Sequence, residues 1–244
     1  MSYQIQNFDE ELVNFIRTGA GSPYYGNLSE QVIGVIYELG FDSDSKVLDI
    51  GAGNTASITK GIVKVLPQIE ITCVDELINI VELESNISWI QTDMMQDDLV
   101  LGQFDAIFWI APYLGDSWFD GSFEKLVHKL GKNLKPQGLF MLDMFNFQNL
   151  EIGFSIEKQA KNNTTTFIKS STDKYEGKRT FLDGKTMDLI WKVFTDQELE
   201  SIFKQSGFKL KKRLHSFGEN LPENIKKMIN YQKIPRNIYI FEKS

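Results

Sequence analysis

The stretch Ser45-Lys-Val-Leu-Asp-Ile-Gly-Ala-Gly-Asn-Thr-Ala56 decides the fold of this chain. Before the first glycine it has a short apolar run, typical of a strand that is buried on both faces. Gly51 and Gly53 interrupt that run, and apolar residues then recur at helical spacing from Ile58 to Leu66. The stretch therefore predicts a strand, a tight glycine-rich turn and a helix.

Such a turn predicts a site for a nucleoside cofactor. Glycine lets the backbone approach a ligand closely, and the start of the helix offers unpaired N–H groups. The spacing Gly51-x-Gly53-x-x-Ala56 fits the loose dinucleotide fingerprint. Asp49, at the end of the strand and just before the glycines, instead favours a cofactor that carries an ammonium group, because a carboxylate repels a pyrophosphate. A structural turn without a ligand is the third interpretation.

Composition limits the classes of function that this chain can have. The 244 residues suffice for one α/β domain with an elaboration, and 42% are hydrophobic, as in globular proteins. The net charge of −7 argues against a broad nucleic-acid interface. The single cysteine, Cys73, excludes disulfides within the chain and a Cys-rich metal site. No signal-like N-terminus and no long apolar run is present, so we expect a cytoplasmic protein that does not contact a membrane.

The chain divides into four predicted parts: an N-terminal helical cap (1–44), a core (45–150), an antiparallel β insertion (151–193) and a closing segment (194–244). In the core, strands alternate with helices, which predicts a doubly wound parallel sheet. The predicted strands cover 47–50, 69–74, 87–91, 104–110 and 139–144, and the predicted helices cover 57–66, 77–84 and 121–134. Ligands of such sheets bind beyond the carboxyl ends of the strands, where the chain places Asp49, Asp75, Asp93 and the loop from Ile110.

The last two parts lack this alternation. Residues 151–192 show period-two patterns separated by two predicted turns, Glu176-Gly177 and Asp183-Gly184, which together predict antiparallel strands over the cofactor cleft. Thr195, with Glu198 three residues later, predicts the start of a helix over 196–206. Strands over 208–214 and 237–242 follow.

The order and spacing of several short motifs resemble the class I S-adenosylmethionine (SAM)-dependent methyltransferases. The resemblance is greatest to the small-molecule branch with a β insertion before the sixth strand. It implies a Rossmann-like, mostly parallel seven-stranded sheet with an antiparallel insertion, and methyl transfer from SAM to a nitrogen or oxygen of a small molecule. The motifs that carry it are Val47-Leu-Asp-Ile-Gly-Ala-Gly53, Gln91-Thr-Asp93-Met94, Phe104-Asp-Ala-Ile-Phe108, Lys132-Asn-Leu-Lys-Pro-Gln-Gly138, Phe194-Thr-Asp-Gln-Glu-Leu199, Gln205-Ser-Gly-Phe208 and Asn237-Ile-Tyr-Ile-Phe-Glu-Lys243.

The resemblance also implies a set of cofactor-binding residues. Asp49 would lie under the methionine amino group, with Gly51 and Gly53 passing close to the cofactor. Asp75 would accept from the ribose hydroxyls, although Glu76 directly after it competes for that role. The remaining predicted contacts are Leu77 and Met94 beside the adenine, Asp93 at the adenine amino group, Ile110 on the opposite side of the site, and Tyr24 or Tyr25 over the methionine end.

For catalysis the sequence offers two candidates. Tyr113 lies in the loop that faces the acceptor in this family, and His215, at the end of the sixth strand, is the candidate general base. The other histidine, His128, falls on the polar side of its helix, and no metal site is expected. The open alternatives are a protein or peptide methyltransferase, a SAM-binding protein without catalysis, and an NAD-dependent oxidoreductase. The sequence does not indicate an oligomeric state.

Overall fold

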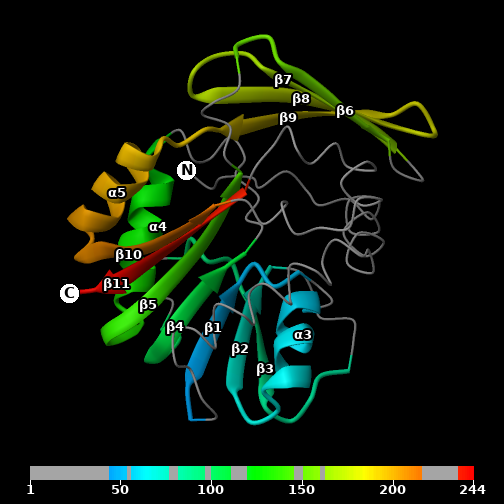
Figure 1. The fold of residues 1–244 in the computed structure, drawn as a ribbon. Helices are drawn as coiled ribbons and strands as arrows, with labels where there is room; N and C mark the ends of the chain where they lie inside the picture. Colours follow the sequence, from blue (N-terminus) through cyan, green and yellow to red (C-terminus); the bar gives the residue numbers. More distant parts are fainter. Residues whose placement is uncertain are drawn as a thin grey trace. The chain divides into compact units, whose positions relative to one another are not determined.

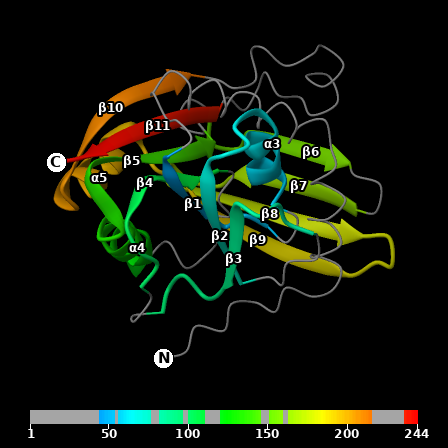
Figure 2. The same cartoon turned by 90° about the horizontal axis from the view of Figure 1, so that it is seen from below.

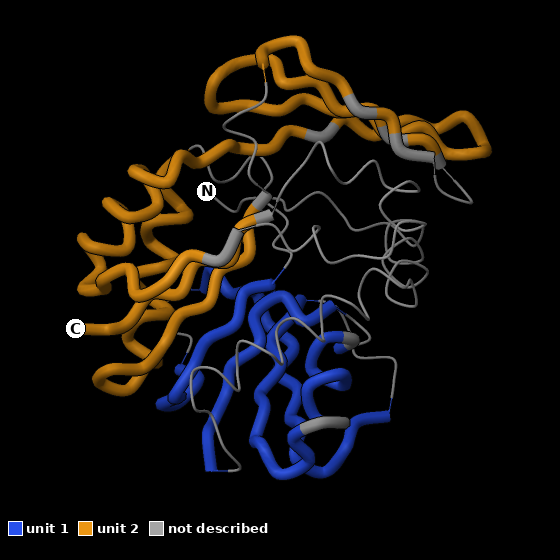
Figure 3. Tube along the Cα trace, in the orientation of Figure 1, with its two compact units in different colours: residues 1–110 blue, residues 111–244 orange. Residues whose placement is uncertain are grey.

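The computed structural model divides into two compact units, residues 1–110 and residues 111–244 (Figure 3). Within these units, the residues that the structure describes are 44–53, 56–76, 82–96, 100–110, 120–145, 151–159, 163–215 and 236–244.

The described residues of the first unit form four parallel strands and one helix. In space the strands follow the order β4-β1-β2-β3, and all three neighbouring pairs are parallel. Helix α3 lies against β1 and β2, because Thr59 of α3 bonds to Asp49 and Cys73 on those strands (Figures 1 and 2). The bounds are β1 Lys46–Ile50, α3 Ser57–Val65, β2 Glu70–Asp75, β3 Ile87–Gln91 and β4 Phe104–Trp109.

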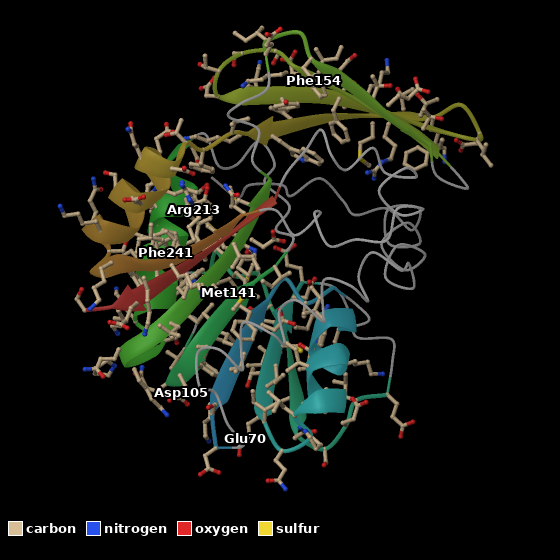
Figure 4. All side chains as sticks on the ribbon, in the orientation of Figure 1. Glu70, Asp105, Met141, Phe154, Arg213 and Phe241 are labelled. Carbon is tan, nitrogen blue, oxygen red and sulfur yellow. The ribbon has the colours of Figure 1, made fainter. Side chains whose placement is uncertain are left out.

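The second unit contributes three strands to the same seven-stranded, mostly parallel sheet. β11 lies between β5 and β10 and is antiparallel to both. Helix α5 packs on these strands through Phe203, whose ring stacks on Phe241 of β11 at 3.7 Å and meets Phe140 of β5 at 5.0 Å (Phe241 is labelled in Figure 4). The bounds are α4 Ser122–Gly131, β5 Leu134–Phe145, α5 Asp196–Gln205, β10 Phe208–His215 and β11 Arg236–Lys243.

A separate four-stranded antiparallel sheet in the second unit is formed by the predicted β insertion. Its strands pair in chain order, β6-β7-β8-β9. One side of this sheet carries a small cluster of buried Tyr175 and Val193 with Phe167 and Trp191 packed against them. The bounds are β6 Ser155–Gln159, β7 Asn163–Lys169, β8 Lys174–Phe181 and β9 Thr186–Lys192.

These elements confirm the predicted α/β fold with its antiparallel insertion. The predicted start of α5 is also confirmed, because Thr195 and Glu198 form a complete capping box. Cys73 is buried in the core and His128 is exposed, as expected.

Three predictions of secondary structure were wrong. Residues 82–84 are not helical. The predicted helix over 121–134 ends at Gly131, and Leu134 begins β5 instead, where its carbonyl accepts from Lys243 Nζ of β11 at 2.6 Å. The predicted turn Glu176-Gly177 lies inside β8, where Gly177 pairs with Phe167 of β7. In both strand cases pairing within a sheet overrides the local signal.

Several predictions fall on residues that the structure does not describe. They include the N-terminal helical cap up to residue 43, residues 77–81 of the predicted second core helix, and the loop after Ile110 as far as residue 119. Among the helices that are described, none has both the length and the apolar character needed to cross a membrane.

Candidate cofactor site

The glycine-rich turn between β1 and α3 has the backbone that the sequence predicts. Gly51 and Gly53 both have φ of 66°, in the left-handed region that favours glycine. Gly51 N donates to Val74 O on the neighbouring strand β2 at 2.8 Å, so the turn stays attached to the sheet. Ala56, with φ of 45°, precedes α3 and provides no side-chain cap for it.

The described residues do not crowd this turn at Gly51. A Cβ added at Gly51 would have Trp109 Nε1, at 3.8 Å, as its nearest atom outside the adjacent residues. Glycine is therefore required here by the backbone conformation and not by crowding. The missing side chain leaves room for a ligand to approach the backbone.

Asp49 is a buried carboxyl group directly before the turn. Its side chain is 4% exposed, and Oδ2 accepts a hydrogen bond from Thr59 Oγ1 at 2.5 Å. Burial raises the pKa of Asp49 to about 7; the hydrogen bond from Thr59 opposes this shift, and the charge of Asp75 adds to it. Near neutral pH this carboxyl group is thus poised between its neutral and charged forms.

Asp75 connects the end of β2 to the same turn. Its Oδ2 accepts a hydrogen bond from Gly53 N at 2.8 Å. The carboxylate therefore stabilises the turn directly, in addition to the ribose role that the resemblance implies for it.

A second pair of acids lies at the ends of β2 and β3. The pKa of Glu76 is raised to about 7, mainly by burial and then by the charge of Asp93 and a hydrogen bond between the two side chains. Asp93 Oδ1 also accepts from Met95 N at 2.7 Å, which holds the turn after β3. The structure thus adds Glu76 to this cluster of acids.

The carboxyl ends of the four parallel strands bring most of the predicted cofactor residues to one edge of the first unit. At this edge lie Asp49, Gly51, Gly53, Asp75, Asp93, Met94 and Ile110. The acids Glu70 and Asp105, labelled in Figure 4, lie at the opposite edge, at the amino ends of β2 and β4.

The structure does not test the other predicted site residues. Tyr24, Tyr25, Leu77 and Tyr113 lie outside the described residues. His215 belongs to the second unit, where it pairs with Asn237 across β10 and β11. Among the described side chains, no group of three acids, histidines or cysteines is arranged to hold a metal ion.

Sequence reasoning missed two partners of Asp49. Thr59 is buried in α3 and bonds to Asp49 and to Cys73, whose Sγ lies 3.4 Å from Thr59 Oγ1. No motif marks Thr59, since its contact with Asp49 depends on how α3 packs against the sheet. Cys73 had been assigned only to the core, although it is the β2 residue paired with Asp49.

Comparisons with known proteins support the fold. No family model matches the sequence, and no curated protein matches it. A SAM-dependent methyltransferase from Clostridium acetobutylicum is 13% identical with a TM-score of 0.61, covering 90% of this chain and 92% of its own. SAM-bound CalS10, an amino pentose methyltransferase from Micromonospora echinaspora, is 14% identical with a TM-score of 0.60, covering 96% and 97%.

The same fold also carries a different reaction. The [4+2]-cyclase SpnF is 14% identical to this chain with a TM-score of 0.51, and the match covers 87% of this chain and 80% of SpnF. These similarities establish the architecture, whereas the activity has to be inferred from the residues of the site. In architecture, the chain has the fold of the class I SAM-dependent methyltransferases.

Proposed function

We propose that this protein binds SAM at the carboxyl ends of β1 to β4 and transfers its methyl group to a nitrogen or oxygen of a small molecule. One observation carries the proposal: the left-handed glycine turn is bordered by the buried carboxyl of Asp49 and held by Asp75 through Gly53 N. This combination suits a ligand that has a cationic end and a sugar with hydroxyl groups.

Charge favours SAM over a dinucleotide. Asp49, Asp75, Glu76 and Asp93 all lie at the edge where the ligand would bind. Carboxylates attract an ammonium or sulfonium group and accept hydrogen bonds from ribose hydroxyls, whereas they repel a pyrophosphate. The NAD-dependent oxidoreductase therefore has the least support.

In this proposal the residues of the chain mainly bind and orient. SAM supplies an activated methyl group when it is bound. Asp49 then holds the cationic end and Asp75 the ribose, which fixes the direction of the methyl group relative to the acceptor. Alignment of two reactants can lower a barrier by roughly 7–11 kcal/mol, so a site with little acid–base chemistry of its own can still be effective. The catalytic roles of Tyr113 and His215 remain predictions.

A small-molecule acceptor is favoured over a macromolecule. The net charge of −7 disfavours nucleic acid, and CalS10 is described as an amino pentose methyltransferase. Amino sugars are therefore the first acceptors to test, followed by other amines and phenols. A peptide acceptor is the next alternative. We also propose that the protein acts in the cytoplasm.

The binding test compares two matched aspartates. Asp75 Oδ2 accepts from Gly53 N, and Asp105 Oδ2, at the amino end of β4, accepts from Lys46 N, both at 2.8 Å. We expect calorimetry to show saturable binding of SAM and S-adenosylhomocysteine but not of NAD. Asp75→Asn should weaken SAM binding about 10- to 100-fold, the range for a lost charged hydrogen bond, and Asp105→Asn should leave it unchanged. Binding of NAD alone, or equal effects of the two substitutions, would contradict the proposed site.

A second test separates an enzyme from a binding protein. The protein that binds SAM is incubated with amino sugars, amines and phenols, and S-adenosylhomocysteine is measured by mass spectrometry. Its release, together with a methylated product, is the expected outcome. SAM binding without turnover on any acceptor would favour a non-catalytic protein or, given SpnF, another reaction on the same fold.

A further inference from the structure

Three side chains from three elements form a buried chain of hydrogen bonds behind the glycine turn. Cys73 of β2 and Thr59 of α3 are both 0% exposed, and Asp49 of β1 is 4% exposed. Cys73 Sγ donates to Thr59 Oγ1 at 3.4 Å, and Thr59 Oγ1 donates to Asp49 Oδ2 at 2.5 Å. Only Asp49 belongs to a recognised motif.

The chemistry of the thiol sets the direction of this chain. Burial, the first cause, and the charge of Asp49 raise the pKa of Cys73 well above its usual range. The thiol therefore keeps its hydrogen at neutral pH and can act as a donor. The Thr59 hydroxyl accepts this weak bond through a lone pair. Its own hydrogen can therefore point at Asp49. A donor aimed at a carboxyl oxygen stabilises the charged form of that group.

The groups around Asp49 oppose one another. From β2, Asp75 acts on Asp49 with a like charge, and Cys73 is neutral. From β4, the residue paired with Asp49 is Phe108, which carries no charge. From α3, Thr59 donates the one hydrogen bond to the Asp49 carboxyl that is recorded among the described residues. Of these neighbours, Thr59 alone favours the carboxylate.

We propose that Thr59 is a positioning residue, which holds the Asp49 carboxylate through Oδ2 and keeps it charged, so that Oδ1 can receive the ammonium group of SAM. This inference rests on the proposed function. It adds that the affinity for SAM depends on a hydroxyl group that does not contact SAM. Cys73 acts one step further away, by orienting that hydroxyl.

The test uses substitutions that differ in one hydroxyl group. Thr59→Val removes the hydroxyl and keeps the branched shape, whereas Thr59→Ser retains it. Thr72→Val is the matched control, because Thr72 lies on β2 and its hydroxyl accepts from Ser88 at 3.0 Å, away from Asp49. Melting temperatures show whether each variant is folded. Thr59→Ser should keep the wild-type properties, so it allows the comparison even if Thr59→Val is poorly folded.

The first readout is the ionisation of Asp49 without any ligand. Protein labelled with ¹³C at the aspartate carboxyl carbons is titrated by NMR, and Asp49→Asn assigns the signal. Labelling aspartate alone excludes the Glu76 carboxyl, which titrates in the same range. Loss of a hydrogen bond to a charged group should move the Asp49 midpoint up by about one pH unit in Thr59→Val. Thr59→Ser and Thr72→Val should keep the wild-type midpoint.

The second readout is the dissociation constant for SAM between about pH 6 and pH 7, where an α-amino group is mostly protonated. A midpoint one unit higher lowers the charged fraction of Asp49 at pH 7 about fivefold, so Thr59→Val should bind SAM about fivefold more weakly there. Thr59→Ser should restore the affinity.

The outcomes separate the two proposals. An unchanged midpoint in Thr59→Val, or an affinity change that Thr59→Ser does not restore, overturns the role of Thr59 and leaves SAM binding intact. A wild-type protein that does not bind SAM overturns both proposals, and the NMR titration then still shows whether Thr59 governs the charge of Asp49.

Discussion

The glycine turn of the first unit and the antiparallel sheet of the second unit use glycine for opposite reasons. Gly51 has a left-handed backbone, and an added Cβ there would come no closer than 3.8 Å to a described atom, Trp109 Nε1. Gly177 lies in a regular strand, but a Cβ there would come within 2.4 Å of Phe167 Cδ1 and 3.0 Å of Thr166 O. Phe167 in turn stacks on Trp191 at 4.3 Å. The chain itself fills the space above Gly177, whereas among the described residues an added Cβ at Gly51 would meet only Trp109 Nε1, at 3.8 Å.

This difference separates a requirement of folding from a requirement of binding. A side chain at Gly177 would displace an aromatic ring from its own sheet, so the effect should appear in stability. A side chain at Gly51 would project into space that we assign to SAM, so the effect should appear mainly in affinity. The turn also carries a buried acid, whereas the cluster around Gly177 is mostly aromatic.

The largest expected effect concerns that acid and pH. The pKa of Asp49 rises from 3.8 to about 7 on folding, so the folded protein binds more protons than the unfolded chain between these values. Its contribution to stability is complete below about pH 4 and is lost as the pH rises through about 7. The full shift corresponds to roughly 4 kcal/mol, and the raised pKa of Glu76 acts in the same direction.

Urea denaturation of the unliganded protein at several pH values measures this effect. Asp49→Asn removes the charge, so this variant should be more stable than the wild type at pH 8 and should lose less stability between pH 4 and pH 8. It should also bind SAM poorly. A variant with the wild-type pH dependence would show that Asp49 is not the group that titrates.

The next effect is at Gly177. Gly177→Ala should lower the free energy of unfolding by about 2–3 kcal/mol, as overpacking does, because the ring of Phe167 has to move. Gly184→Ala is the control, since Gly184 has a left-handed φ of 84° but no atom within 4 Å of an added Cβ. It should lose only the roughly 1 kcal/mol of backbone strain. Equal melting temperatures for the two variants would refute the packing explanation.

A smaller loss of stability than at Gly177 is expected at Gly51. Gly51→Ala should destabilise the protein by about 1–2 kcal/mol through its left-handed backbone. Its affinity for SAM should nevertheless fall at least about tenfold, because the new methyl group lies beside the turn. Calorimetry below the melting temperature separates the two effects, and unchanged affinity would mean that the ligand does not pass this side of the turn.

The sequence predicts those features that depend on neighbouring residues and on strand direction. The apolar run before Gly51 gives β1, and parallel strands must end at one edge, so the strand-end acids Asp49, Asp75 and Asp93 could be assigned to one site. The start of α5 at Thr195 could also be predicted, because it depends only on neighbouring capping residues.

The failures share a different cause. The helical spacing continues through Leu134, but Leu134 begins the long strand β5, most of which pairs with β11, so tertiary pairing and not local spacing decides its conformation. Glu176-Gly177 has the composition of a turn, yet Phe167 from the neighbouring strand occupies the place of a side chain. Thr59 could not be found because its partners, Asp49 and Cys73, are brought to it by packing.

The position of β11 has a consequence for protein synthesis. The ribosome makes β5 early and β10 much later, but neither pairs with the other, since β11 lies between them and is made after both. Tyr239 of β11 donates a hydrogen bond to Asp196 of α5, which also forms an ion pair with Arg213. This hydrogen bond likewise cannot form until β11 has been made. Long-range pairing of this kind is slow to form. The nascent second unit should therefore expose unpaired strand edges until β11 leaves the exit tunnel, a period in which chaperones have most to protect.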